Sequence, residues 1–340
     1  MNFFTSNDLS IRPVSTSVKK ELSVFNGNFV RFFGSLDFEG FQWNLTLGSQ
    51  ITTLQLRNLI FELGVRMDLN SSIKLNHGTP MPWLGFGVFQ IPPGPQTYDA
   101  VRTALKVGYR AIDTAAAYGN EEDVGRAIRD SGVDRNKVFV TTKVWNTDQG
   151  YDNTLKAFET SKTKLALDTL DLYLIHWPAK REFTETWRAM EKLHREGQIR
   201  AIGVSNFLVH HLETLLEKAE VIPAVNQVEF HPLNVQPALL EFCKNNRIRV
   251  EAWSPLGRGR FFDMPAIREI AEKHGRSPAQ VLIRWDLQHE VVTIPRSTQE
   301  AHIRENSEVF DFELSGEEMS RLDALDEGRR IGPDPDSFTG

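Results

Sequence analysis

The sequence predicts an α/β fold, a (β/α)8 TIM barrel over residues 72–340 with an N-terminal β-hairpin, preceded by a poorly structured extension over residues 1–71. Eight apolar runs of strand type alternate with amphipathic stretches of helix type, the pattern of a parallel sheet covered by helices. A length of 340 residues allows one such barrel or two smaller domains. The alternative, a doubly wound sheet, lacks its dinucleotide signature, because Gln90 stands where a third glycine should follow Gly85 and Gly87.

The hairpin comes first in the chain, in the segment SIKLNHGTPMPWLGFG that begins at residue 72. The strand runs follow at residues 85–89, 110–113, 138–143, 172–176, 200–205, 224–230, 249–254 and 291–295. Between them lie helix-type stretches such as QTYDAVRTALKVG and NEEDVGRAIRDSG. Several of these stretches end at a glycine, as the C-terminal caps of helices commonly do.

Residues 1–66 differ in composition from the rest of the chain. They hold 9 of the 22 phenylalanines but no alanine, tyrosine or histidine, and their apolar residues keep no sustained period. Only residues 52–64 are typical of a helix. Because the barrel pattern begins just after Met67, we expect Met67 to be the natural start and the preceding segment to belong to an over-long gene model. A regulatory arm is the alternative.

Composition limits the partners of the chain. A net charge of −6 gives no basic field for a nucleic-acid backbone, and no run reaches the roughly 18 apolar residues that span a bilayer. The single cysteine, Cys243, cannot form an internal disulfide and lies in a helix-type stretch, where we expect a buried, inert thiol. We therefore expect a cytoplasmic monomer with neither nucleic acid nor membrane as a partner.

Polar side chains end the strand runs, where a barrel of this kind places its chemistry. Asp113, Lys143 and His176 each end a run, and Tyr118 follows Asp113 closely. A phenol, with a reference pKa of about 10, becomes a competent acid near neutrality when a cation such as Lys143 stabilises its phenolate. Asp113 can orient the ammonium and His176 can bond a substrate carbonyl, although each residue alone could be a cap, a solvated charge or a packing residue.

The sequence offers no pattern typical of a metal site. It contains neither an HExxH motif nor a cysteine cluster, and we expect the adjacent His210 and His211 to point in different directions from a helix. A carbonyl polarised by a phenol without a metal needs hydride from an organic cofactor.

Seven motifs in order resemble the aldo-keto reductase superfamily: GYRAIDTAAAYGNEE, VFVTTKVWN, DLYLIHWP, IGVSNF, VNQVEFHP, AWSPLGRGR and IPRSTQEAHIRENSEVFDFEL. The resemblance covers about residues 72–340 and is nearest to the bacterial branch of 2,5-diketo-gluconate and glyoxal or methylglyoxal reductases. It implies an NADPH-dependent reductase in which Asp113, Tyr118, Lys143 and His176 form the catalytic tetrad and Tyr118 is the general acid.

The resemblance also implies a cofactor site. Its residues are Ser205, Asn206 and Gln227 at the nicotinamide carboxamide, Trp253 stacked on the ring, Ser254, Leu256 and Arg258 at the pyrophosphate, and Arg296, Ser297, His302, Glu305 and Asn306 at the adenosine end. The chain departs from the family at His302, where an arginine usually clasps the 2′-phosphate of NADP. An imidazole lacks the permanent charge and fork of a guanidinium, so we expect NADPH to be preferred modestly, with NADH a weaker alternative.

Aromatic residues after three strand runs predict the substrate pocket. Phe89, Trp145 and Trp177 stand beside the proposed tetrad residue His176, although Phe89 could equally serve packing. Short loops after the fourth and seventh runs leave little material to enclose a large ligand, so we expect a small aldehyde, α-dicarbonyl or keto sugar as substrate.

Two rival functions remain on the same fold. One is a non-catalytic, nucleotide-binding regulatory subunit, which the full tetrad does not exclude. The other is a barrel hydrolase, which needs paired carboxylates or a metal at the strand ends, and Asp113 is the one strand-end carboxylate that the sequence places well for this role.

Overall fold

The computed structural model describes residues 19–25, 29–35, 43–47, 67–179 and 183–338. The chain divides into two units, Met1–Arg66 and Met67–Gly340. In the first unit, β1 (Lys19–Phe25), β2 (Phe29–Ser35) and β3 (Trp43–Leu47) form an antiparallel sheet in the order β1-β2-β3. The sequence did not predict these strands, since a run such as FVRFF in β2 does not alternate apolar and polar residues. The helix predicted at 52–64 lies outside the described residues.

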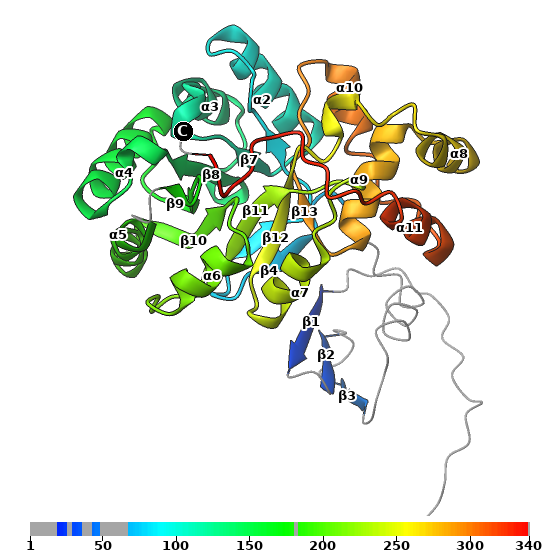
Figure 1. Cartoon of the computed structure of the whole chain (residues 1–340), viewed down its shortest axis with the longest axis horizontal. Helices are drawn as coiled ribbons and strands as arrows, with labels where there is room; N and C mark the ends of the chain where they lie inside the picture. Colours follow the sequence, from blue (N-terminus) through cyan, green and yellow to red (C-terminus); the bar gives the residue numbers. More distant parts are fainter. Residues whose placement is uncertain (1–18, 26–28, 36–42, 48–66, 180–182, 339–340) are drawn as a thin grey trace, which may run out of the picture. The chain divides into compact units, whose positions relative to one another are not determined.

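The second unit is the predicted barrel (Figure 1). Eight parallel strands follow one another in chain order, namely β6 (Phe86–Gly87), β7 (Ala111–Asp113), β8 (Phe139–Val144), β9 (Leu170–Ile175), β10 (Ile199–Ser205), β11 (Val225–Glu229), β12 (Arg249–Trp253) and β13 (Val292–Thr293). The first and last meet through a parallel bridge between Leu84 and Thr293, where the amide of Gly85 donates to the Thr293 carbonyl at 2.9 Å. The sheet therefore closes, and the predicted fold is confirmed.

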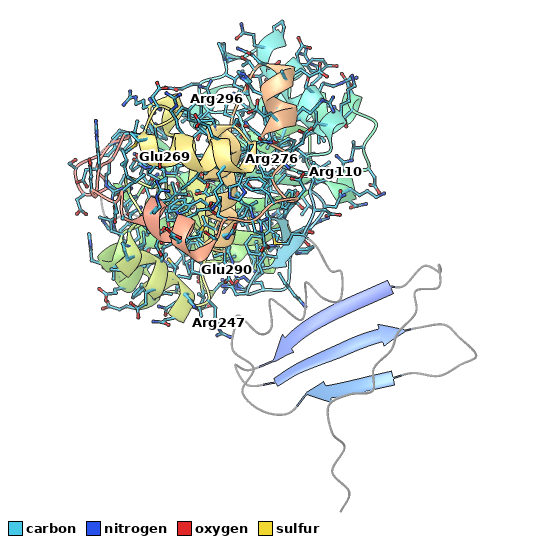
Figure 2. The ribbon with its side chains drawn as sticks, turned by 90° about the vertical axis from the view of Figure 1, so that its right-hand side faces the viewer. Arg110, Arg247, Glu269, Arg276, Glu290 and Arg296 are labelled. Atoms are coloured by element: carbon cyan, nitrogen blue, oxygen red, sulfur yellow. The ribbon has the colours of Figure 1, made fainter. Side chains whose placement is uncertain are left out.

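Helices surround the strands. They are α2 (Pro95–Val107), α3 (Glu121–Asp130), α4 (Tyr151–Leu165), α5 (Phe183–Arg195), α6 (Val209–Leu216), α7 (Pro237–Asn245), α8 (Pro265–His274), α9 (Pro278–Gln288), α10 (Glu300–Glu305) and α11 (Gly316–Asp323). Among these helices, α9 shows how local sequence sets a boundary, because Ser277 and Gln280 form a reciprocal capping box around Pro278. Charged side chains such as Arg247, Glu269 and Glu290 lie on the outer surface (Figure 2).

Close packing of strands and helices builds the core. Every residue of β8 and β9 is buried, as expected for strands covered on both faces. Between α3 and α4 the backbones approach so closely that a Cβ at Gly125 would lie 2.1 Å from the Leu165 carbonyl oxygen, so this position requires glycine. Cys243 is buried in α7, and burial raises the pKa of its thiol to about 12, which fits the expected inert role.

The predicted hairpin is present, and it closes the N-terminal end of the barrel. Its strands are β4 (Ser72–Lys74) and β5 (Pro80–Pro82). Beside them, Leu75 and Met81 pack against Ala111 and Phe139, the first residues of β7 and β8. Because this end is filled, the opposite end, where the strands finish, is the one that remains for a site. Among the described residues, the helices are too short or too polar to traverse a lipid bilayer.

Candidate active site

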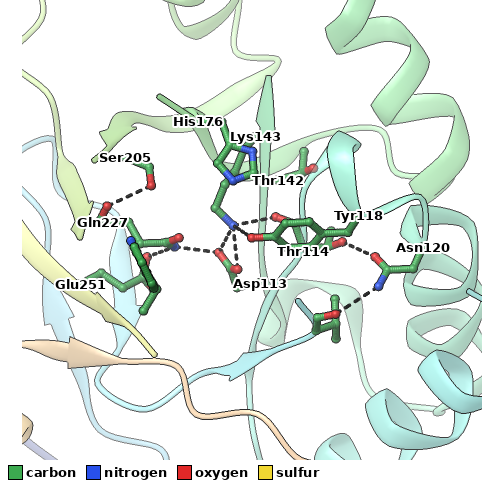
Figure 3. A network of polar contacts seen from close by, with 12 residues as sticks. Asp113, Thr114, Tyr118, Asn120, Thr142, Lys143, His176, Ser205, Gln227 and Glu251 are labelled. Atoms are coloured by element: carbon green, nitrogen blue, oxygen red, sulfur yellow. Dashed lines mark hydrogen bonds and ion pairs between the residues drawn. The ribbon is translucent and has the colours of Figure 1, made fainter. Parts of the chain in front are cut away.

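The four residues of the predicted tetrad come together at the C-terminal end of the barrel (Figure 3). Asp113 ends β7, Lys143 lies near the end of β8 and His176 follows β9, so parallel strands bring all three to one edge. Tyr118 ends a short 3-10 helix, Ala116–Tyr118, that follows β7.

Asn120 holds the loop that carries Tyr118. Its side-chain oxygen accepts from the Thr114 hydroxyl at 2.7 Å, and its amide donates to the carbonyls of Val88 and Ile91, each at 3.2 Å. These bonds tie the loop after β7 to the loop after β6 and thereby fix the backbone around Tyr118. Sequence analysis missed this residue because an asparagine beside a glycine is equally typical of an ordinary turn.

A buried ion pair lies at the centre of the site. The Lys143 ammonium donates to the two Asp113 carboxylate oxygens at 2.7 and 2.8 Å and to the Thr114 carbonyl at 2.9 Å. Burial alone would lower the pKa of Lys143, but the charge of Asp113 and the hydrogen bond to it act in the opposite direction, and the pKa is raised. The ammonium therefore stays charged although the side chain is wholly buried.

Tyr118 lies next to this ion pair, with its hydroxyl 3.4 Å from the Lys143 nitrogen. The sequence analysis expected the Lys143 charge to lower the pKa of Tyr118 towards neutral pH, and the structure corrects this expectation. Burial is the largest cause and raises the pKa of Tyr118 to about 12, while the Lys143 charge acts in the opposite direction. The phenol therefore keeps its proton at ordinary pH and can serve as a donor.

His176 is the neutral member of the site. Burial, followed by the positive charge of Lys143, holds its pKa well below the usual value, so the imidazole carries no charge. Its ring meets the edges of Tyr118 and Trp145, with centroids 5.6 and 5.0 Å away. A neutral imidazole can donate one hydrogen bond to a carbonyl oxygen without adding a second cation beside Lys143.

The residues predicted to hold a nicotinamide carboxamide form one bonded group. The amide of Asn206 donates to the His176 carbonyl at 3.0 Å, and the Trp253 indole donates to the Asn206 side-chain oxygen at 2.8 Å. The Ser205 hydroxyl donates to the backbone carbonyl of Gln227 at 2.9 Å. These contacts fix the polar side chains and the indole before any ligand binds.

Glu251 is a second buried carboxyl beside the tetrad, inside β12, and sequence analysis missed it. The Gln227 side-chain nitrogen donates to Asp113 at 2.8 Å and to Glu251 at 2.7 Å. Because Glu251 lies inside its strand, the expectation that Asp113 is the one strand-end carboxylate well placed for a hydrolase stays a prediction. A signal was available, because strand alternation puts Glu251 on the same face of β12 as Trp253.

The site opens into one cavity of about 890 Å³. Apart from the buried Lys143, every residue predicted for the tetrad, the cofactor and the substrate lies on its wall, including Phe89, Trp177, Ser254, Leu256, Ser297, Glu305 and Asn306. The Phe89 ring lies 5.0 Å from the Tyr118 ring and is 42% exposed, so it serves the cavity surface more than the core. Aromatic walls and a polar floor suit a small ligand with one reactive polar group.

Basic side chains form part of the cavity wall. Arg258, Arg296 and His302 all line it. Burial and the nearby positive charge of Arg258 lower the pKa of Arg296, which places the two guanidinium groups within electrostatic reach of each other. Arg304 instead pairs with Glu300 at 3.5 Å and does not line the cavity. Two adjacent guanidinium groups are suited to phosphate oxygens.

The chain segment after α11 completes the cavity, which sequence analysis did not foresee. Glu229 accepts from the backbone amides of Ile331 and Gly332. Further along, Phe338 packs on Trp177 with ring centroids 4.4 Å apart and approaches Trp145 at 6.2 Å. The segment has no hydrophobic period, so only its contacts show where it lies.

His210 and His211 also hold this segment, and the expectation that their side chains diverge is wrong. The Nε2 atoms of both lie near one Asp336 oxygen, at 2.9 and 3.4 Å, and their rings lie 4.0 Å apart. The Leu208 amide donates to Nδ1 of His211 at 3.2 Å, so a neutral His211 carries its proton on Nε2. A nitrogen that carries a proton cannot bind a metal ion, and the cluster is better described as an anchor for Asp336.

Comparisons with known proteins agree with this site. The model of the Aldo/keto reductase family matches residues 84–327. Glyoxal reductase of Bacillus subtilis is 57% identical over 270 residues, covering 79% of this chain and 98% of the relative. Methylglyoxal reductase DkgA of Escherichia coli is 46% identical over 272 residues, with coverages of 79% and 98%. A crystal structure of a Gox0644 mutant in complex with NADPH has a TM-score of 0.76 at 44% identity and covers 79% of this chain and 98% of that one.

Proposed function

Because this chain belongs to the aldo/keto reductase family and is an NAD(P)H-dependent oxidoreductase, we propose that it reduces small aldehydes and α-dicarbonyls to alcohols with NADPH, Tyr118 being the proton donor. The observation that carries the proposal is the contact of Tyr118 with the buried Lys143–Asp113 ion pair on the wall of an aromatic cavity. The complete tetrad and the named reductases among the relatives favour turnover over a regulatory subunit. We assign the reductase to residues 72–340.

The donor set of the cavity fits a nicotinamide nucleotide. Ser205, Asn206 and Gln227 offer the hydroxyl and amide groups that a carboxamide requires, Trp253 offers an aromatic face, and Arg258 with Arg296 offers charge for phosphate. When bound, such a cofactor supplies the hydride. A reductase that depends on NADPH needs a supply of it, so we place the enzyme in the cytoplasm. We propose that the enzyme is a monomer.

Each residue of the tetrad has its own role in the transfer of the proton. Neutral His176 donates a hydrogen bond to the substrate carbonyl and holds it near the Tyr118 hydroxyl. The Tyr118 phenol then gives its proton to the carbonyl oxygen, and the Lys143 ammonium stabilises the phenolate that is left. Asp113 keeps the ammonium charged and in place. Phe89, Trp145 and Trp177 exclude water from the reacting carbonyl.

A substrate panel tests the proposal. Initial rates of NADPH oxidation are measured with methylglyoxal, glyoxal, aromatic aldehydes, keto sugars and steroids, with protein-free reactions as blanks. We expect the small aldehydes and α-dicarbonyls to give the highest kcat/KM, because Phe338 and the tryptophans narrow the cavity. Faster turnover of steroids, or no turnover of any carbonyl, would contradict the proposal.

Cofactor choice gives a second expected result. Replacing His302 with arginine adds a permanent cation to the cavity wall that Arg258 and Arg296 also line. We expect kcat/KM for NADPH to rise roughly ten- to hundredfold, the size of one charged hydrogen bond, while that for NADH changes little. The matched control is Arg304→Gln, which removes a charge that Glu300 already pairs and should leave the NADPH/NADH ratio unchanged. An unchanged ratio in His302→Arg would remove His302 from the phosphate site.

A further inference from the structure

Glu251 is a buried acid that the mechanism above does not use. It lies in the middle of β12 and is 1% exposed. Gln227 on β11 donates to it at 2.7 Å, and the same nitrogen donates to Asp113 at 2.8 Å (Figure 3). Asp113 is in turn bonded to Lys143, and Lys143 contacts Tyr118. A chain of direct contacts therefore runs from Glu251 to the proposed proton donor.

The carboxyl groups of Asp113 and Glu251 set the orientation of the Gln227 side-chain amide. A primary amide has two N–H groups and one oxygen, and here both N–H groups have an acidic partner. The nitrogen thus faces Asp113 and Glu251, and the amide oxygen is left for other partners. Because Gln227 lines the cavity, its amide can present an acceptor there only while Glu251 and Asp113 hold the nitrogen.

Glu251 also changes the charge of the cluster. When Asp113 and Glu251 are ionised and Lys143 is protonated, the three groups carry a net charge of about −1. Protonation of Glu251 brings this net charge to zero. Burial, followed by the Asp113 charge, raises the pKa of Glu251 to about 8, while the Gln227 bond and the Lys143 charge oppose this rise. The ionised form raises the pKa of both Tyr118 and Lys143. Its proton is therefore exchanged close to ordinary working pH.

We propose that Glu251 is a positioning residue of the reduction, which orients Gln227 and sets through its own protonation the charge that faces Tyr118. This inference rests on the proposed function. The groups that face Glu251 come from three strands: Gln227 from the adjacent β11, and Asp113 and Lys143 from β7 and β8. As pH rises, Glu251 loses its proton, the added negative charge holds the Tyr118 proton more tightly, and proton donation slows.

Single-turnover rates as a function of pH test the role of Glu251. Enzyme mixed with NADPH is reacted with excess methylglyoxal, and the loss of NADPH is followed by stopped flow. We expect the wild-type rate constant to fall roughly fivefold between about pH 6.5 and pH 9.5, as one buried charge near a proton donor would cause. Glu251→Gln keeps the acceptor for Gln227 without the charge, so its rate should vary less than about twofold over this range. Glu251→Asp should restore the fall.

Asp286→Asn is the matched control. Asp286 on α9 is also a wholly buried carboxyl, and burial raises its pKa well above the usual value. Its side chain accepts a hydrogen bond from Thr293 and has none with the tetrad. An acid with a raised pKa in the folded state loses its contribution to stability as pH rises from the unfolded towards the folded pKa. Both variants should therefore flatten the fall of melting temperature with pH, whereas only Glu251→Gln should flatten the rate profile.

Two kinetic outcomes overturn the inference. In the first, the rate constant of Glu251→Gln depends on pH as that of the wild type does. In the second, Asp286→Asn reduces the pH dependence of the rate constant as much as Glu251→Gln does. If the wild-type chain turned over no carbonyl, the proposed function would fail while this inference could still be judged by NMR. The side-chain amide signals of Gln227 should shift with pH near 8 in the wild type and stay constant in Glu251→Gln, and identical titrations would overturn the inference on their own.

Discussion

Replacing Tyr118 with phenylalanine will lower the turnover of carbonyl substrates by about 10²- to 10⁴-fold, the range in which loss of a general acid falls. The change removes only the hydroxyl that lies 3.4 Å from the Lys143 nitrogen. The ring keeps its contacts with Phe89 and His176, so the cavity and the fold should persist. The measurement is kcat with NADPH and methylglyoxal, together with NADPH affinity by fluorescence titration and the melting temperature.

Tyr98→Phe is the control for this variant. Tyr98 lies on α2, and its hydroxyl donates to Asp130 at 2.8 Å outside the cavity. It should leave kcat unchanged. If Tyr118→Phe kept more than about a third of wild-type turnover with an intact fold, its role as proton donor would be wrong.

Replacing Lys143 with methionine will damage both activity and stability. The ammonium balances Asp113 at 2.7 Å and approaches the Tyr118 hydroxyl, so its loss leaves a buried carboxylate without its cation. Breaking a buried pair in this way costs about 3–5 kcal/mol. We expect turnover to fall by at least about 10²-fold, because no cation then stabilises the phenolate. Chemical denaturation and steady-state kinetics measure the two effects.

A double variant separates these effects. Adding Asp113→Asn to Lys143→Met removes the unbalanced carboxylate and should recover much of the free energy of unfolding, but not the turnover. Recovery of both would show that Lys143 acts on the reaction only through stability, and recovery of neither would show that the Asp113 charge is not the cause of the instability.

The barrel could be predicted because its signals are local and repeated. Most of a buried parallel strand such as β9 is an apolar run, here LYLI at residues 172–175, that the sequence displays directly, and the residues that end such runs meet at one edge of the sheet. This is why Asp113, Lys143 and His176 could be named from their positions alone. The actual pKa of Tyr118 could not be predicted, because burial and the Lys143 charge oppose each other and only the structure shows which is larger.

Other features depend on contacts between distant parts of the chain. The bond between His210 and Asp336 joins residues 126 positions apart, and that between Gln227 and Asp113 joins residues 114 apart. Neither pair has a periodic pattern that marks it. Glu251 stood within a correctly predicted strand, but its acid side chain could be explained only when Gln227 was seen to join it to Asp113.

One wall of the substrate cavity is separate from the scaffold that supports the reaction. Phe338 belongs to the irregular segment after α11, which Glu229 and Asp336 attach, whereas the tetrad rests on barrel strands and the loop that follows β7. Substrate selectivity can therefore change without a change in catalytic rate, because mutation of this segment alters the cavity wall at Phe338 while the proton donor stays in place. A library restricted to Pro333 and Phe338, which line the cavity, would sample new substrates and leave the anchors at Gly332 and Asp336 in place.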